Sequence, residues 1–355
     1  MARSPKCMEL MMLIKRMKAA MSLSLCALCI LSAFSVAAAA AEISDTGIHA
    51  RDPYVLEYHG VYYMYGTGIA EEGYGCVYSK DLKAWSEPVT VFAPDEDFDG
   101  VGEWWAPECH YYKGAFYLFA SYHSAASDKR GTAVFRADHP LGPFEIISGG
   151  HITPKDRDCI DGTLYVDENG QPWMVYVGEW TSNADGIGDM MAAKLSDDLT
   201  AFVSEPILLF RGDAPRERTA GITDGPFLYQ TKNGRLLLLW SYFGKTGYCV
   251  QIAFSSNGSI DGKWRQQPGC LYQQTDKHAD GGHGMLFTGP NSTLTLAVHS
   301  PNFATEGNPT TAIFVPVDDI GDTLVTTEEN HIFVRLGYRV YYLMITVLSF
   351  LHFDA

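Results

Sequence analysis

The chain has 355 residues, of which 46% are hydrophobic and 13% aromatic, so a large apolar core can form and a disordered protein is excluded. The formal net charge of −16 argues against a nucleic-acid partner, because phosphates would be repelled rather than neutralised. This charge fits a neutral or weakly charged ligand.

The first residues, 1–41, predict a secretory signal peptide. Lys15, Arg16 and Lys18 precede the apolar stretch MSLSLCALCILSAFSV, and small residues follow up to a cleavage site near Ala41. The alternative is a transmembrane anchor, but the apolar stretch is shorter than the ~20 residues that a span needs. We therefore expect a secreted or periplasmic protein without stable membrane insertion.

Residues 42–330 contain five copies of one unit, and each copy predicts a β-hairpin. A polar residue beside Gly or Pro opens a short apolar strand, a turn such as HG, KG or ENG follows, and a second apolar strand completes the hairpin. The copies are RDPYVLEYHGVYYMYGTG from Arg51, WAPECHYYKGAFYLFASYHS from Trp105, IDGTLYVDENGQPWMVYVGEW from Ile160, TDGPFLYQTKNGRLLLLWSYF from Thr223 and GGHGMLFTGPNSTLTLAVHSPN from Gly281.

The segments between the hairpins repeat as well, and each reads as a turn between two outer strands: SKDLKAW, ADHPLGPF, SDDLTAF and SSNGSIDGKW. Four strands in each of five units predict an all-β, five-bladed β-propeller that occupies residues 42–330 as one domain. Residues 331–355 form a C-terminal tail, and the sequence leaves open whether this tail adds a closing strand or is poorly ordered.

In a propeller the first strand of every blade lines the central channel, so the polar residues that open these strands should converge on one axis. These residues are Asp52, Glu108, Asp161, Asp224 and His283. Glu179 ends the second strand of the third unit. Because that strand runs antiparallel to the first, we expect the Glu179 carboxylate to lie beside Asp161.

Crowded, partly desolvated carboxylates have pKa values that are pushed apart, so that one group stays protonated while another is ionised. Hydrolysis of a glycosidic bond needs this division, because one carboxyl protonates the leaving oxygen while another activates water or attacks directly. The alternative is structural, since Asp before Gly or Pro is often a turn former. Four acids and a histidine at corresponding positions favour a catalytic site.

The segments ARDPYVL, WAPE, IDGTLYVDENG, DGPFLY, SKDLKAW and PLGPF resemble glycoside hydrolase family 43, over residues 43 to about 317. The resemblance implies an inverting hydrolase on a five-bladed propeller that removes or cuts arabinofuranosyl or xylosyl units of plant polysaccharides. It also implies that Asp52 is the general base that activates water. Asp161 would tune the pKa of the general acid and orient it.

The general acid is where this chain departs from the family it resembles. The family has a glutamate in an EGP segment at the start of the fourth blade, whereas this chain reads TDGP with Asp224. Aspartate is one methylene shorter, so its carboxyl would sit back by about 1.5 Å. Three alternatives follow: Asp224 reaches through a shifted backbone, Glu179 supplies the proton, which we favour slightly, or the propeller is an inactive carbohydrate-binding protein.

Further residues are candidates for contact with a glycan or a metal. Trp104 and Trp105 could stack on a sugar face, although neighbouring residues on a strand point to opposite sides and one of them is expected in blade packing. The resemblance implies that His283 in GGHG binds a structural calcium ion through water, with a hydrogen-bonded structural histidine as the alternative. The other predicted substrate-binding residues are Glu108, His123 and His299.

Overall fold

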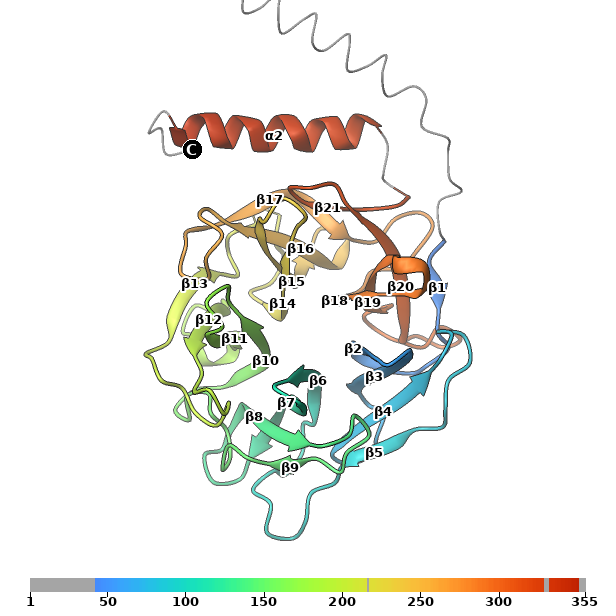
Figure 1. The fold of residues 1–355 in the computed structure, drawn as a ribbon, viewed down its shortest axis with the longest axis vertical. Helices are drawn as coiled ribbons and strands as arrows, with labels where there is room; N and C mark the ends of the chain where they lie inside the picture. The colour runs from blue at the N-terminus through green and yellow to red at the C-terminus, as the bar shows by residue number, and fades with distance from the viewer. Residues whose placement is uncertain (1–41, 216, 329–331, 351–355) are drawn as a thin grey trace, which may run out of the picture.

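The structure is a computed structural model that describes residues 42–215, 217–328 and 332–350. Five antiparallel sheets are arranged in a ring, which confirms the predicted five-bladed β-propeller (Figure 1). The predicted signal peptide, residues 1–41, lies outside the described residues. In the part of the chain that is described, no helix combines the length and the apolar character needed to cross a membrane.

Blades 1 to 4 each contain four strands that pair in chain order, with the first strand nearest the axis (Figure 1). Blade 1 consists of β2 (Arg51–Tyr58), β3 (Val61–Thr67), β4 (Tyr74–Ser79) and β5 (Val89–Phe92). Blade 2 consists of β6 (Trp105–Tyr112), β7 (Ala115–Ser124), β8 (Lys129–Ala137) and β9 (Glu145–Ile146). Blade 3 consists of β10 (Cys159–Val166), β11 (Pro172–Gly178), β12 (Asp189–Lys194) and β13 (Ile207–Arg211). Blade 4 consists of β14 (Asp224–Gln230), β15 (Leu236–Gly244), β16 (Gly247–Ser255) and β17 (Trp264–Tyr272).

Blade 5 has an extra strand because both ends of the domain contribute to it. Its inner strands are β18 (Gly282–Thr288), β19 (Leu294–Ser300) and β20 (Thr311–Asp319), and β20 pairs with both β1 (Ser44–Asp45) and β21 (Leu324–Thr326). Two short 3-10 helices cover Trp180–Ser182 and Pro290–Ser292. The N-terminal strand β1 thus helps to close the ring.

The described part of the C-terminal tail is helix α2 (Ile332–Phe350), so the alternative that this tail adds a closing strand is wrong. The helix lies beside β17 of blade 4 (Figure 1). Tyr338 and Tyr342, four residues apart on one helix face, donate hydrogen bonds from their hydroxyls to the Pro268 carbonyl and to Gln267 Oε1.

The hairpin turns show why the repeats could be recognised. In blades 1 and 2 the turns are His59-Gly60 and Lys113-Gly114, and both residues of each turn have positive φ angles. Such two-residue turns have a twist that matches the right-handed twist of the flanking strands. The predicted hairpins at these two positions are therefore confirmed.

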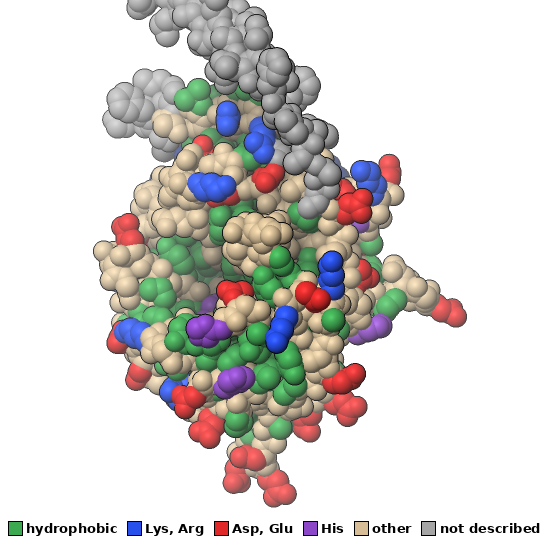
Figure 2. Space-filling model, turned by 45° about the vertical axis from the view of Figure 1, so that its right-hand side comes forward, with side chains coloured by type: hydrophobic (Ala, Val, Ile, Leu, Met, Phe, Trp, Pro, Cys, Tyr) green, Lys and Arg blue, Asp and Glu red, His purple; other side chains and the backbone are tan. Residues whose placement is uncertain are grey.

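The surface carries the acidic excess that the composition predicts. The loop that joins β5 to β6 protrudes at the bottom of the molecule in Figure 1, and Figure 2 shows acidic side chains gathered along that lower margin. This loop contains Asp95, Glu96, Asp97 and Asp99.

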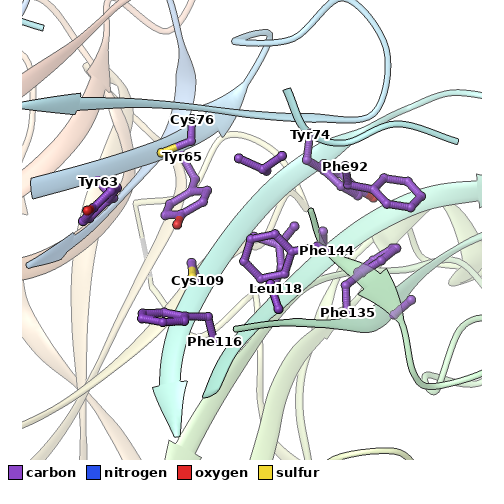
Figure 3. Packing of buried hydrophobic residues seen from close by; sticks show 14 of the residues in the cluster. Tyr63, Tyr65, Tyr74, Cys76, Phe92, Cys109, Phe116, Leu118, Phe135 and Phe144 are labelled. Atoms are coloured by element: carbon purple, nitrogen blue, oxygen red, sulfur yellow. The ribbon is translucent and has the colours of Figure 1, made fainter. Parts of the chain in front are cut away.

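The core lies between neighbouring blades, so the middle strands are covered on both faces. In β15, residues 236–240 (LLLLW) are all fully buried, which explains a continuous apolar run where a one-sided strand would alternate. Figure 3 shows the cluster between blades 1 and 2, where Tyr65 and Phe92 face Leu118 and Phe135. Each such side chain stabilises the fold by about 1.5–3 kcal/mol, and this packing fixes the inner strands around the axis.

Candidate active site

Each innermost strand contains a β-bulge, and the residue at the bulge has a positive φ angle. The five bulge residues are Asp52 (53°), Ala106 (45°), Asp161 (56°), Gly225 (54°) and His283 (52°). A non-glycine residue in this conformation costs about 1–3 kcal/mol, and such strain clusters at functional sites. The sequence analysis treated Glu108 and Asp224 as equivalent to the other three residues. The bulges correct this alignment, because Glu108 lies two residues after the bulge of blade 2 and Asp224 lies directly before the bulge of blade 4.

Side chains on the second strand of the preceding blade hold most of these bulges in place. The acceptors are His299 Nδ1 for the N–H of Asp52 (3.2 Å), Thr67 Oγ1 for Ala106 (2.8 Å), Ser121 Oγ for Asp161 (3.0 Å) and Ser241 Oγ for His283 (2.8 Å). Blade 3 has Val177 at the corresponding position, where the side chain has no hydrogen-bonding atom, and there the N–H of Gly225 donates to Asp161 Oδ2 instead (3.0 Å). One catalytic candidate therefore accepts the hydrogen bond that a structural side chain accepts elsewhere.

Asp52 is placed to act as an ionised carboxylate. Its side chain is 13% exposed, Oδ2 accepts a hydrogen bond from the Thr67 hydroxyl (2.7 Å), and Oδ1 lies 3.2 Å from Nδ1 of His283. Burial alone would raise the pKa of Asp52, but the charge and hydrogen bond of His283 hold this pKa well below its usual range. An ionised carboxylate next to the axis can accept a proton from water.

His283 bridges the two inner aspartates. Its Nδ1 lies 3.2 Å from Asp52 Oδ1 and 3.7 Å from Asp161 Oδ2. Burial alone would lower the pKa of the imidazole, but the two carboxylates raise it to about 10. The imidazolium at neutral pH balances part of the negative charge that the carboxylates bring to the axis.

The predicted calcium ion at His283 stays a prediction. Among the described residues, no three His, Cys, Asp or Glu side chains are grouped as a metal site requires. Nδ1 of His283 is engaged by the aspartates. Its Nε2 is buried and has no hydrogen-bond partner within the described residues, which leaves one atom free to contact a water molecule.

Asp161 and Asp224 form the second half of the candidate site. Burial raises the pKa of Asp161 to about 6, and burial together with the charge of Asp161 raises the pKa of Asp224 to about 8. The hydroxyl of Tyr248 donates a hydrogen bond to Asp224 Oδ2 at 2.8 Å. At neutral pH Asp52 is therefore ionised while Asp224 is mostly protonated, which is the division of roles between a base and an acid.

The structure does not support Glu179 as a proton donor beside Asp161. Glu179 is 3% exposed, and its carboxylate accepts two hydrogen bonds from the Arg130 guanidinium, at 2.7 Å and 3.1 Å. In this bidentate pair the carboxylate acts as a hydrogen-bond acceptor. The side chain of Glu179 thus binds a cation of blade 2, and its role as the proton donor stays a prediction.

Two of the predicted substrate-binding residues are buried and have partners within the protein. His299 is fully buried. Its Nδ1 accepts the hydrogen bond from the backbone N–H of Asp52, and its Nε2 lies 3.0 Å from Asn302 Oδ1. Glu108 is 4% exposed and lies 3.3 Å from Nε2 of His110. Their predicted contact with a glycan stays a prediction.

The remaining predicted contacts divide between packing and the rim. Trp104 packs in the aromatic cluster of blade 2, with its ring 5.9 Å from that of Tyr122. Trp105 is partly exposed next to the bulge of blade 2, and the Arg130 guanidinium lies 5.5 Å from the centre of its ring. His123 is also partly exposed and is held between Glu103 and Asp128, both at 3.1 Å. Trp105 and His123 remain candidates for sugar contact.

The sequence reasoning missed the residues that orient the site: Thr67, Ser121, Ser241 and Tyr248. Thr67, Ser121 and Ser241 occupy the same position of three second strands, since they pair with Arg51, Trp105 and Asp224. An alignment of the five hairpins on their second strands would have shown a recurring hydroxyl there. Tyr248 lies on a third strand and has no comparable signal in the sequence.

Comparisons with known proteins agree with this fold. The sequence model of the family described as Glycosyl hydrolases family 43 matches residues 47–314. An extracellular exo-alpha-(1->5)-L-arabinofuranosidase of Cellvibrio japonicus is 24% identical over 78% of this chain and 82% of its own length. The crystal structure of an endo-arabinase from Bacteroides thetaiotaomicron is 33% identical, with a TM-score of 0.69 over 77% of this chain and 95% of that one. An endo-1,4-beta-xylanase from the same organism is 27% identical, with a TM-score of 0.68 over 80% of this chain and 96% of that one.

Proposed function

Because the chain belongs to glycosyl hydrolase family 43 and is a glycoside hydrolase, we propose that it is secreted and cleaves arabinofuranosyl or xylosyl linkages of plant polysaccharides with inversion. The similar proteins support this substrate class, since their names include an arabinofuranosidase, an arabinase and a xylanase. Secretion is supported by the basic and apolar pattern of residues 1–41 and by a relative whose name includes the word extracellular.

The observation that carries the proposal is the opposite pKa shift of two aspartates on the same axis. Asp52 is the general base, since His283 keeps its carboxylate ionised and able to take a proton from water. Asp224 is the general acid, since burial and the charge of Asp161 keep its carboxyl protonated up to a pH of about 8. Inversion requires a water molecule between base and sugar, and therefore acid and base carboxyls about 6.5–9.5 Å apart.

Asp161 tunes the acid without taking part in proton transfer itself. Its negative charge raises the pKa of Asp224, and the N–H of Gly225, the residue after Asp224, donates to its carboxylate. This hydrogen bond fixes the strand that carries the acid against the neighbouring blade. Tyr248 orients the shorter side chain of Asp224 through its hydroxyl.

Asp52→Asn tests the catalytic role on a panel of aryl arabinofuranosides, aryl xylosides, linear arabinan and xylan. The substitution keeps the size of the side chain but removes the base, so kcat should fall by about 10²- to 10⁴-fold. The anomer released by the parent protein, followed by NMR at early times, reports inversion. A product with retained configuration would contradict the proposed mechanism.

A second candidate, a binding protein without turnover, rests on Asp224, which is shorter than the glutamate found in the family this sequence resembles. The same panel separates the two candidates. Binding of arabinan or xylan by the parent protein without any release of reducing sugar would favour the binding protein. Turnover that is lost in Asp52→Asn would favour the hydrolase.

A further inference from the structure

A cavity of about 670 Å³ lies on blade 2, away from the catalytic aspartates. Its walls come from the protruding loop between β5 and β6, from the end of β7, and from the loop that follows β9, around residues 97–99, 122–127 and 146–155. The volume falls within the range of about 300–1,000 Å³ that small-molecule sites have. None of the residues assigned to the hydrolytic site above lines it.

The cavity and the hydrolytic site share a strand. Ser121 of β7 accepts the N–H of Asp161 through its hydroxyl, and the next residue, Tyr122, lines the cavity. Neighbouring residues of a strand point to opposite faces of the sheet, so β7 has the hydrolytic site on one face and the cavity on the other. The end of β7 also returns to the side of the blade where β6 begins, as the pairing of Ser121 with Trp105 shows.

The cavity wall contains buried polar atoms that the described residues leave without hydrogen-bond partners. These atoms are the hydroxyl of Tyr122, Nε2 of His151 and Oγ of Ser127. Tyr122 is fully buried and His151 is 5% exposed. A buried polar group without a partner costs about 1–3 kcal/mol, so water or another molecule in the cavity would supply partners for these three groups.

The backbone next to these groups keeps the cavity open. Gly149 and Gly150 have positive φ angles of 62° and 114°. A Cβ at Gly150 would lie 4.0 Å from the Tyr122 hydroxyl and 3.9 Å from Nζ of Lys155. Glycine at this position leaves the space in front of them free.

The chemistry of the wall selects a neutral molecule with several hydroxyls. Burial lowers the pKa of His151 to about 4, so its ring is neutral and offers one donor and one acceptor, as the Tyr122 hydroxyl does. Asp97 and Asp99 in the wall disfavour an anion, and Lys155 offsets part of their negative charge. Phe98 is partly exposed and adds an apolar surface.

We propose that this cavity is a second glycan-binding site, which holds a neutral sugar unit of the polysaccharide chain while another part of the chain lies at the catalytic aspartates. The inference rests on the proposed function for the identity of the glycan. The site would keep a long substrate on the enzyme between cleavage events. It would not be needed for a substrate with a single sugar.

The test uses the full-length Asp52→Asn protein, so that binding is measured without hydrolysis. Isothermal titration with linear arabino-oligosaccharides and xylo-oligosaccharides should show two sites. Adding Tyr122→Phe, which removes one hydroxyl and keeps the ring, should weaken one site by about tenfold and leave the other unchanged. Ser127→Ala, at a partly exposed turn, should weaken the same site, and this second variant keeps the test valid if Tyr122→Phe misfolds.

Tyr176→Phe is the matched control, because the Tyr176 hydroxyl is also buried without a partner among the described residues but does not line the cavity. This variant should retain both sites. A single site in the Asp52→Asn protein, or no effect of both cavity variants, would overturn the inference and show that water alone fills the cavity. If the parent protein hydrolyses nothing while both sites bind, the proposed function fails and the inference stands.

Discussion

The backbone N–H of Gly225 donates a hydrogen bond to Oδ2 of Asp161 at 3.0 Å and so joins the strand of the proposed acid to the aspartate that tunes it. Blades 1, 2, 4 and 5 use a Thr, Ser or His side chain on the second strand for the corresponding N–H. Val177 occupies this position in blade 3, and its side chain has no hydrogen-bonding atom. The neighbouring carboxylate therefore has both a structural and an electrostatic role.

Gly225→Ala should damage the site for two separate reasons. The φ angle of 54° costs a side chain about 1–3 kcal/mol, and the new Cβ would approach the His283 ring to 2.8 Å. We expect lower thermal stability and a lower kcat, because His283 must shift away from Asp52. Gly234→Ala is the control, since Gly234 has a φ angle of 79° with open space around it. That variant should lose stability and keep its kcat. An equal loss of kcat in both variants would contradict this account.

Asp224→Asn and Glu179→Gln should separate the two candidate acids. Loss of the true acid should lower kcat by about 10²- to 10⁴-fold on glycans with poor leaving groups and largely spare activated aryl glycosides, which depart without a proton. We expect this pattern for Asp224→Asn. Glu179→Gln should instead lower the free energy of unfolding by about 1–3 kcal/mol, because Arg130 loses one of its charged partners.

Kinetics on both classes of substrate, together with thermal denaturation, check this assignment. Asp224→Glu serves as the control that keeps a carboxyl at the same place in the chain. If Glu179→Gln instead lost activity only on substrates with poor leaving groups, Glu179 would be the general acid, as the sequence analysis favoured.

The sequence was sufficient to predict the fold and the place of Asp52, Asp161 and Asp224 on inner strands, because hairpin turns and the polar starts of these strands are local features. It failed where a contact depends on register. Gly178 pairs with Cys159, and Glu179, one residue further, binds Arg130 of another blade. A shift of one residue reverses the face of a strand, and the β-bulges add such shifts at every inner strand. The contact between Tyr248 and Asp224 joins the first and third strands of a blade, which no local pattern records.

Thr67→Val should weaken the link between the base and blade 2. The Thr67 hydroxyl accepts the N–H of Ala106 and donates to Asp52 Oδ2. Valine keeps the shape of the side chain and leaves both groups without this partner, so we expect a loss of about 1–3 kcal/mol in the free energy of unfolding. A misplaced Asp52 should also lower kcat, by up to about 100-fold. Thr67→Ser retains a hydroxyl and should recover most of both properties; failure to do so would show that the methyl group, rather than the hydrogen bonds, matters.

The pH dependence of kcat/KM should report the proposed acid. Asp224 acts in its protonated form, so activity should fall as the pH rises through its pKa of about 8. The Tyr248 hydroxyl stabilises the ionised form and lowers this pKa. Tyr248→Phe removes that hydrogen bond, so the Asp224 pKa should rise and the alkaline limb should move to higher pH. The phenyl ring of this variant can keep the stacking that the Tyr248 ring makes with His299. A limb that stays in place or moves to lower pH in this variant would show that a group other than Asp224 donates the proton.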